Sequence, residues 1–210
     1  PRIGRQPKLT ESKITECIVL DKDMRAENFM MFTVLSKELG LTYALKRISA
    51  KKQTFLPDYF DVISATLSAK SKNSPFFIES FDITKKLCGK PTSYNSLVAM
   101  GKIAKTIIKN APFLEDCSRI YKTFSAALTA YENTDVPEIV NIKWLYDFAK
   151  SEGYPVKEDF LSTLPDSDYE SFVGIVKTPV LKCAANKDCA KHILKLFETW
   201  VSLKTDIVLE

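Results

Sequence analysis

The segment FMMFTVLSKELGLTYALKRI, residues 29–48, decides the predicted fold of the N-terminal half. Aromatic and β-branched side chains dominate both of its halves, and such residues are enriched in β-strands. Gly40 separates the halves, and glycine takes the positive φ of a tight turn without steric cost. The segment therefore predicts two short strands joined at a turn.

Three further runs of the same kind flank this segment. They are KITECIVLD (13–21), YFDVISATLSAK (59–70) and PFFIESFDIT (75–84), and the polar SKNS (71–74) predicts a hairpin turn between the last two. Five short strands suit a small barrel, and the five-stranded oligonucleotide-binding (OB) barrel has the right size. We therefore expect an OB-fold β-barrel over residues 1–88, which include a basic N-terminal arm.

After Pro91 the apolar spacing changes from a period of two to 3.6, which indicates helices. Thr92 or Ser93 is expected to cap the first helix. Asp135 and Pro137 mark the start of a later helix and Gly153 its end. Residues 89–210 therefore predict an all-helical domain, and the whole chain an α+β fold. The expected buried positions are Tyr94, Leu97, Gly101, Ala104 and Ile108 in the first helix, Leu114, Cys117, Ile120, Tyr121, Phe124, Leu128 and Tyr131 in the second, and Ala190, Ile193, Leu194, Phe197, Trp200 and Val201 in the last.

Composition narrows the functional classes. Hydrophobic residues make up 45% of the chain and charged residues 27%, an ordinary globular balance. No apolar run approaches the ~20 residues of a membrane span, so no membrane association is expected. Five cysteines without paired spacing favour a reducing, cytoplasmic setting. The single histidine, His192, cannot by itself supply the common triads or paired-histidine sites, so we expect no enzyme and no cofactor.

Charge is unevenly distributed along the chain. Residues 1–110 carry 19 Lys and Arg against 10 Asp and Glu, a net charge of +9, whereas residues 111–210 carry −5. A basic half of this kind favours a polyanionic partner, although two differing solvated surfaces are the alternative.

The cations are densest in LKRISAKK, residues 45–52, and no acidic residue lies between Glu38 and Asp58. Such a cluster neutralises phosphates and releases their counterions. Phe55 and Tyr59, beside this loop, are candidates for base stacking, with a core position as the alternative. Strand alternation puts Tyr43 on one face with Leu41 and Leu45, so Tyr43 is expected in the core. The predicted DNA-binding residues are Arg25, Lys46, Arg47, Lys51, Lys52, Phe55, Tyr59, Lys70 and Lys72.

Two clusters in the helical half have competing interpretations. Lys102, Lys105 and Lys109 form a basic stripe that would extend the DNA path, bind an acidic partner or simply face solvent. Cys183, Cys189 and His192 supply three potential zinc ligands, but structural zinc almost always has four. We therefore predict buried cysteines and no metal site.

Residues 15–53 contain a distinctive order of features. They are Cys17-Ile18-Val19-Leu20, Glu27, Thr33, Glu38-Leu39-Gly40-Leu41 and the basic stretch from Lys46 to Gln53. This order resembles the RecO family of bacterial recombination mediators. Ala26 and Arg47 stand where that family often has glycine, and the four-cysteine zinc module of many members has no counterpart here.

The resemblance implies a nucleoid-associated DNA repair and recombination mediator without covalent catalysis. It implies non-specific binding of single-stranded DNA, with double-stranded DNA as a further candidate, and strand annealing or recombinase loading. It also implies contact with the C-terminal tail of the single-strand-binding protein SSB and with RecR. Two alternatives stay open: a protein-interaction adaptor with little DNA affinity, and an enzyme using Asp166, Asp168 and Glu170 of LPDSDYES, a segment that predicts a solvated turn.

Overall fold

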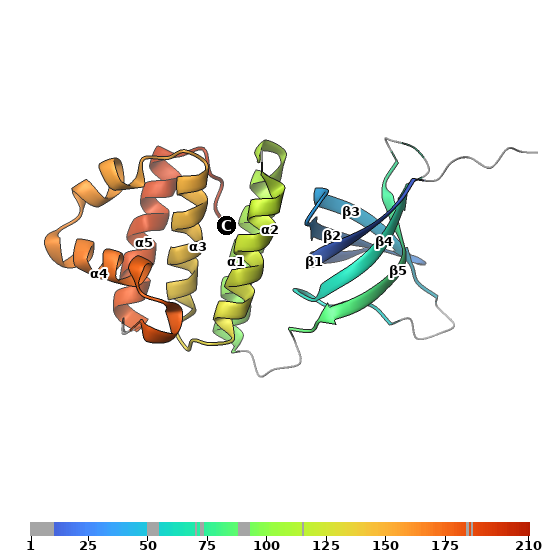
Figure 1. Cartoon of the computed structure of the whole chain (residues 1–210), viewed down its shortest axis with the longest axis horizontal. Helices are drawn as coiled ribbons and strands as arrows, with labels where there is room; N and C mark the ends of the chain where they lie inside the picture. The colour runs from blue at the N-terminus through green and yellow to red at the C-terminus, as the bar shows by residue number, and fades with distance from the viewer. Residues whose placement is uncertain are drawn as a thin grey trace, which may run out of the picture. The chain divides into compact units, whose positions relative to one another are not determined.

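The chain folds into two compact units, Pro1–Cys88 and Gly89–Glu210. The computed structural model describes residues 11–49, 55–69, 71, 74–87, 93–114, 116–183, 185 and 187–210. A five-stranded sheet forms the first unit and helices form the second, so the α+β class is confirmed (Figure 1).

All five expected strands are present. The sheet has the order β1-β2-β3-β5-β4, and β4 pairs back with β1, so that the sheet closes on itself. Every neighbouring pair is antiparallel except β3 and β5, whose short parallel ladder joins Ala44 to Phe76 and Leu45 to Phe77. The strands are β1 (Glu11–Ala26), β2 (Phe29–Ser36), β3 (Gly40–Arg47), β4 (Val62–Ala69) and β5 (Phe76–Lys85).

The long first strand makes this closure possible. Its first half pairs with β4 and its second half with β2, and a register shift between Val19 and Asp21 lies near the changeover. Bulges of this kind bend a strand and increase its twist. Alternate residues of all five strands point inward and form one core, which contains Cys17, Val19, Phe32, Val34, Ala44, Ile63, Ala65, Leu67 and Ile78.

The second unit is built around α3 (Pro137–Ser151), which contacts the other four long helices. Pro137 occupies its first turn and Gly153, at φ +87°, follows its end, as the sequence predicts. The other helices are α1 (Tyr94–Asn110), α2 (Cys117–Tyr131), α4 (Asp166–Lys177) and α5 (Lys187–Lys204). Between α3 and α4 the chain forms a π-helical turn, η2 (Val156–Phe160), and the short 3₁₀ helix η3 (Leu161–Thr163).

The helix faces that the sequence predicts to be buried are confirmed in α5 and for the most part in α2, but not in α1. All six expected core residues of α5 are buried, and so are five of the seven expected for α2. In α1 the predicted face is confirmed only at Ala104, because Tyr94 is 79% exposed, Leu97 is 37% exposed, and Gly101 and Ile108 are half-buried. The buried face of α1 instead contains Ser96, Ala99, Met100, Ile103, Ala104, Thr106, Ile107 and Asn110.

The segment LPDSDYES is not a turn. Asp166 and Asp168 lie in the first turn of α4, where carboxylates interact favourably with the helix dipole. Within the part of the chain that the structure describes, no helix has the length and apolar character needed to cross a bilayer.

Candidate nucleic-acid interface

Lys46 stabilises the weakest junction of the sheet. Its ammonium group donates hydrogen bonds of 2.9 Å to the carbonyl oxygens of Ile78 and of Glu79 on β5. The parallel ladder between β3 and β5 covers few residues, so the side chain supplies donors that the β3 backbone does not. Because an ammonium has three donors, the predicted phosphate ligand Lys46 already uses two of them inside the protein.

An exposed aromatic ring lies beside this junction. Phe55 is 66% exposed and stacks on Phe81, with ring centroids 6.0 Å apart and an interplanar angle of 16°. Phe81 is half-buried against the core, and the Lys46 ammonium lies 5.8 Å from the centroid of its ring. Phe55 is therefore held in place from one side and accessible to solvent, which is the geometry that base stacking requires.

Two predicted cations lie at one end of the sheet. Arg47 is the last residue of β3 and is exposed, and it is paired across the ladder with Phe29 at the start of β2. Arg25 lies one residue from the end of β1, next to the turn that leads to Phe29. The Arg25 side chain is solvent-exposed, and its Nε lies 3.4 Å from a carboxylate oxygen of Asp23. The ladders thus bring the two guanidinium-bearing residues to the same end.

Tyr43 corrects one prediction from strand alternation. It lies on β3 opposite Thr33 and is 48% exposed, whereas its neighbours Thr42 and Ala44 are buried. The alternation itself is as expected, but the face that carries Tyr43, Leu45 and Arg47 is the outer one. Tyr43 is therefore a further accessible aromatic on the strand that ends in Arg47.

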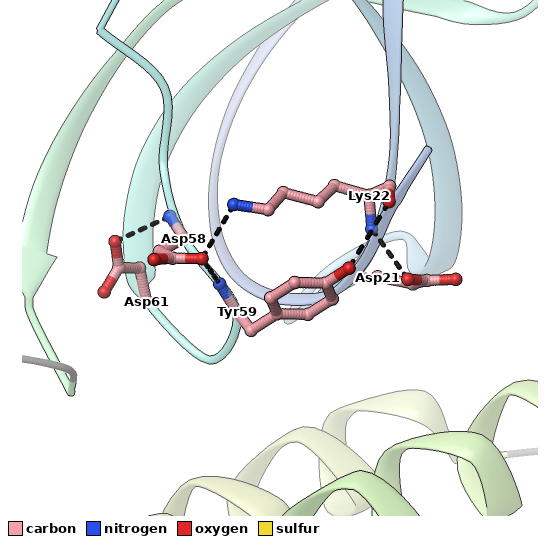
Figure 2. A network of polar contacts seen from close by, with 5 residues as sticks. All are labelled: Asp21, Lys22, Asp58, Tyr59 and Asp61. Atoms are coloured by element: carbon pink, nitrogen blue, oxygen red, sulfur yellow. Dashed lines mark hydrogen bonds and ion pairs between the residues drawn. The ribbon is translucent and has the colours of Figure 1, made fainter. Parts of the chain in front are cut away.

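Tyr59 is part of a polar network rather than a free stacking platform (Figure 2). The Lys22 ammonium lies 5.0 Å from the centroid of the Tyr59 ring and forms a 2.7 Å ion pair with Asp58. The Tyr59 hydroxyl donates to the Lys22 carbonyl oxygen at 3.5 Å, and its backbone amide donates to Asp58 at 2.8 Å. The hydrogen bond from Lys22 holds the pKa of Asp58 below its usual value. The ammonium group of Lys22 thus lies over the ring of Tyr59, which is a predicted DNA contact.

The turn that carries Tyr59 is fixed from within. The backbone amide of Asp58 donates to the fully buried carboxylate of Asp61 at 2.9 Å. Phe60 has a φ of +66°, a left-handed conformation that is strained for an aromatic residue. Its amide donates to the Val19 carbonyl oxygen at 2.8 Å, and its side chain is buried. Burial and this hydrogen bond offset a strain of about 1–3 kcal/mol.

The remaining predicted DNA contacts, Lys51, Lys52, Lys70 and Lys72, lie outside the described residues. Sequence reasoning missed Lys22 and Phe81. Lys22 stands between two aspartates, which is typical of a solvated charge, and Phe81 alternates with polar residues like any half-buried strand position. No local signal in the sequence separates these residues from ordinary surface and core positions.

The basic stripe of α1 contacts a later segment of the same chain. Glu210 forms ion pairs with Lys105 at 2.6 Å and with Lys109 at 2.8 Å. These hydrogen bonds lower the pKa of Glu210 to about 2. The buried amide of Asn110 exchanges two hydrogen bonds with the backbone of Val208, at 2.9 and 3.0 Å.

Lys102, the third residue of the stripe, interacts with a different carboxylate. It lies near Glu198. Burial raises the pKa of Glu198, and the positive charge of Lys102 partly offsets this shift. Two of the three predicted partner-binding lysines are thus engaged with Glu210, while Lys102 remains exposed.

The candidate metal ligands of the helical unit are separate groups. His192 Nε2 lies 3.3 Å from a carboxylate oxygen of Asp168, which links α5 to α4. Cys183 and Cys189 are half-buried rather than buried as predicted. Among the residues with described positions, no cluster of three or more His, Cys, Asp or Glu side chains is arranged to hold a metal ion.

Comparison with known proteins assigns the chain to no family: no protein-family model matches it, and no curated protein matches its sequence.

Proposed function

We propose that the first unit is an OB-fold barrel that binds single-stranded DNA without sequence preference. The observation that carries this proposal is the exposed Phe55 ring, which stacks on Phe81 beside Lys46. The next residue after Lys46 on β3 is the exposed Arg47. OB barrels bind single strands by combining cations that follow the phosphates with aromatic rings that stack on bases. The resemblance of residues 15–53 to the RecO family supports the same function.

The proposed activity is that of a recombination mediator. Guanidinium groups at the strand ends hold two DNA strands by their phosphates and reduce the repulsion between them, while the base edges stay free to pair. This mechanism promotes annealing or recombinase loading without covalent catalysis. Double-stranded DNA, which lacks unstacked bases, is expected to bind through phosphates alone and therefore more weakly.

Salt dependence tests the phosphate contacts. We expect the dissociation constant for a fluorescent oligothymidylate, measured by anisotropy, to rise steeply between 50 and 200 mM NaCl. For single strands, a plot of the logarithm of the association constant against the logarithm of the salt concentration has a slope of about −0.7 for each phosphate neutralised. The double variant Arg25→Glu/Arg47→Glu is expected to lower the magnitude of the slope by at least about 1.4. Lys37→Glu is the matched control, because Lys37 is exposed in the β2–β3 turn at the opposite end of the ladder.

Base stacking is tested separately at Phe55. Phe55→Ala is expected to weaken binding by about 1–3 kcal/mol, or roughly five- to 150-fold, if one base stacks on the ring. The salt slope should stay unchanged, and Phe55→Trp should retain affinity. Equal affinity of the alanine and tryptophan variants would remove the stacking role, and wild-type annealing by Arg25→Glu/Arg47→Glu would refute the proposed interface.

A second candidate function is that of an adaptor for acidic protein segments. The observation in its favour is that Lys105 and Lys109 form ion pairs with Glu210, while the Asn110 amide donates a hydrogen bond to the backbone of Val208. The same contacts would receive the acidic SSB tail, and RecR is the further partner that the family resemblance suggests. We expect an SSB-tail peptide to bind more tightly to Glu210→Ala than to the wild type, and not to bind Lys105→Glu/Lys109→Glu. Tight peptide binding together with weak, salt-insensitive DNA binding would favour the adaptor.

A further inference from the structure

The helical unit contains a cavity of about 430 Å³ that is separate from the α1 stripe. It lies between α3 and α4 and is closed on one side by the η2 and η3 turns. Small-molecule sites typically measure about 300–1,000 Å³, so the cavity has the size of a ligand site. Its wall includes Lys157 of the π-helical turn η2, and π-helical turns are frequent at functional sites.

The inner part of the cavity is aromatic and apolar. Phe172 is buried and packs edge-on against Tyr146, with centroids 5.9 Å apart and an interplanar angle of 70°. Tyr169, on the same helix as Phe172, is 45% exposed at the cavity. Two phenol rings with polar tips, next to a rigid apolar base, suit a planar heterocycle that both stacks and accepts hydrogen bonds.

The rim of the cavity is basic. Lys150, Lys157 and Lys177 line it, and no acidic side chain with a described position does. None of these three ammonium groups has an ion-pair or hydrogen-bond partner among the residues that the structure describes. Lys177 is also not needed to cap α4, because Lys143 donates a 2.8 Å hydrogen bond to the carbonyl oxygen of Val176 at the end of that helix.

We propose that this cavity binds a nucleotide, with the base against Tyr146, Tyr169 and Phe172 and the phosphates between the three lysines. Lysine ammonium groups are common phosphate ligands, and a chain of phosphates matches three cations around one opening. A fatty acid would also use the apolar base, but its single carboxylate would leave two of the ammonium groups without a counter-charge. The site does not depend on DNA binding by the first unit.

Calorimetric titration of the full chain with ATP, in EDTA to exclude metal ions, tests the proposal. We expect saturable binding at sub-millimolar concentrations, and binding of adenosine or tripolyphosphate at least about tenfold weaker, because each fills only half of the site. Lys150→Gln and Lys177→Gln should each weaken ATP binding by about tenfold, the loss typical of one charged hydrogen bond. Tyr169→Ala should weaken ATP binding but not tripolyphosphate binding.

Two control variants separate this site from other basic surfaces. Lys122→Gln removes an exposed lysine of α2 that does not line the cavity, and Arg47→Glu removes the proposed DNA contact. Both should bind ATP like the wild type, and photolabelling with 8-azido-ATP should modify peptides from residues 146–177. The proposal is overturned by an absence of ATP binding, by tripolyphosphate or laurate binding as tightly as ATP, by unchanged affinity in the cavity variants, or by labelling confined to residues 1–88.

Discussion

The adjacent cations Lys46 and Arg47 are expected to affect different properties, although the sequence suggests one shared role. Lys46 donates two hydrogen bonds to β5 carbonyl oxygens, one in a partly buried position and one in an exposed position. Arg47 is exposed and has no such contact among the residues that the structure describes. Lys46→Met keeps most of the aliphatic stem and removes the donors, so the comparison with Arg47→Met isolates the hydrogen bonds.

The magnitude follows from the two bonds. A hydrogen bond to a charged group contributes about 1.5–3 kcal/mol when its loss leaves a buried acceptor without a partner, and much less when water replaces it. We therefore assign about 1.5 kcal/mol to the Ile78 carbonyl and about 0.5 kcal/mol to the exposed Glu79 carbonyl. The sum of about 2 kcal/mol corresponds to roughly a 30-fold change in the opening equilibrium of the β3–β5 junction.

Hydrogen exchange followed by mass spectrometry measures this change directly. Peptides from β3 and β5 of Lys46→Met should exchange about 30-fold faster than in the wild type, while Arg47→Met should exchange at the wild-type rate. Both tryptophans, Trp144 and Trp200, lie in the second unit, so their fluorescence serves as an internal control for that unit. Equal protection in the two variants would refute the structural role of Lys46.

Three further outcomes test the packing and electrostatics. Because Lys22 lowers the pKa of Asp58 in the folded state, the ion pair should stabilise the protein at neutral pH and lose this effect as the pH falls below about 4. The free energy of unfolding, measured by urea denaturation, should therefore differ between wild type and Asp58→Asn by at most about 1 kcal/mol at pH 7, and the difference should vanish at acid pH. Burial raises the pKa of the Cys17 thiol to about 12, so iodoacetamide at pH 8 should modify Cys117, Cys183 and Cys189 before Cys17, as peptide mass spectrometry would show. Phe160 packs against Phe172, Phe197 and Trp200 at centroid distances of 4.9–5.6 Å, and Phe160→Ala should cost about 3–5 kcal/mol in the unfolding transition seen by tryptophan fluorescence.

The strands and the last helix could be predicted from sequence because their burial follows local periodicity. Each β-run contributes alternate side chains to a single core, although β1 and β2 also bury intervening residues such as Ile18 and Leu35, and α5 buries one regular apolar stripe. The face of α1 could not be predicted in this way. Its buried side includes Asn110, whose amide is satisfied by the backbone of Val208, 98 residues further along the chain. A contact so distant in sequence leaves no trace in the local pattern, and it makes burial of a polar residue favourable.

The orientation of β3 has a similar explanation. Alternation alone grouped Tyr43 with Leu41 and Leu45, which favoured an inward tyrosine. The structure instead directs Lys46 toward the β5 carbonyls, and this places Thr42 and Ala44 inside and Tyr43 outside. A lysine on this face is tolerated because the carbonyl oxygens of Ile78 and Glu79 on β5 accept hydrogen bonds from its ammonium group. That condition depends on how the sheet closes and cannot be read from β3 itself.

The boundary between the units also changes how the charge of the chain supports DNA binding. Residues 1–88 carry 15 basic and 10 acidic side chains, a net charge of +5, so four of the nine surplus charges before residue 111 belong to the helical unit. Three of those four are the α1 lysines, and two of the three contact Glu210. The net charge of the N-terminal half is therefore a weak argument for a polyanion site. The stronger argument is positional, because Arg25 and Arg47 come from separate strands yet reach the same end of the sheet, and an exposed ring stacks beside the strand that ends in Arg47.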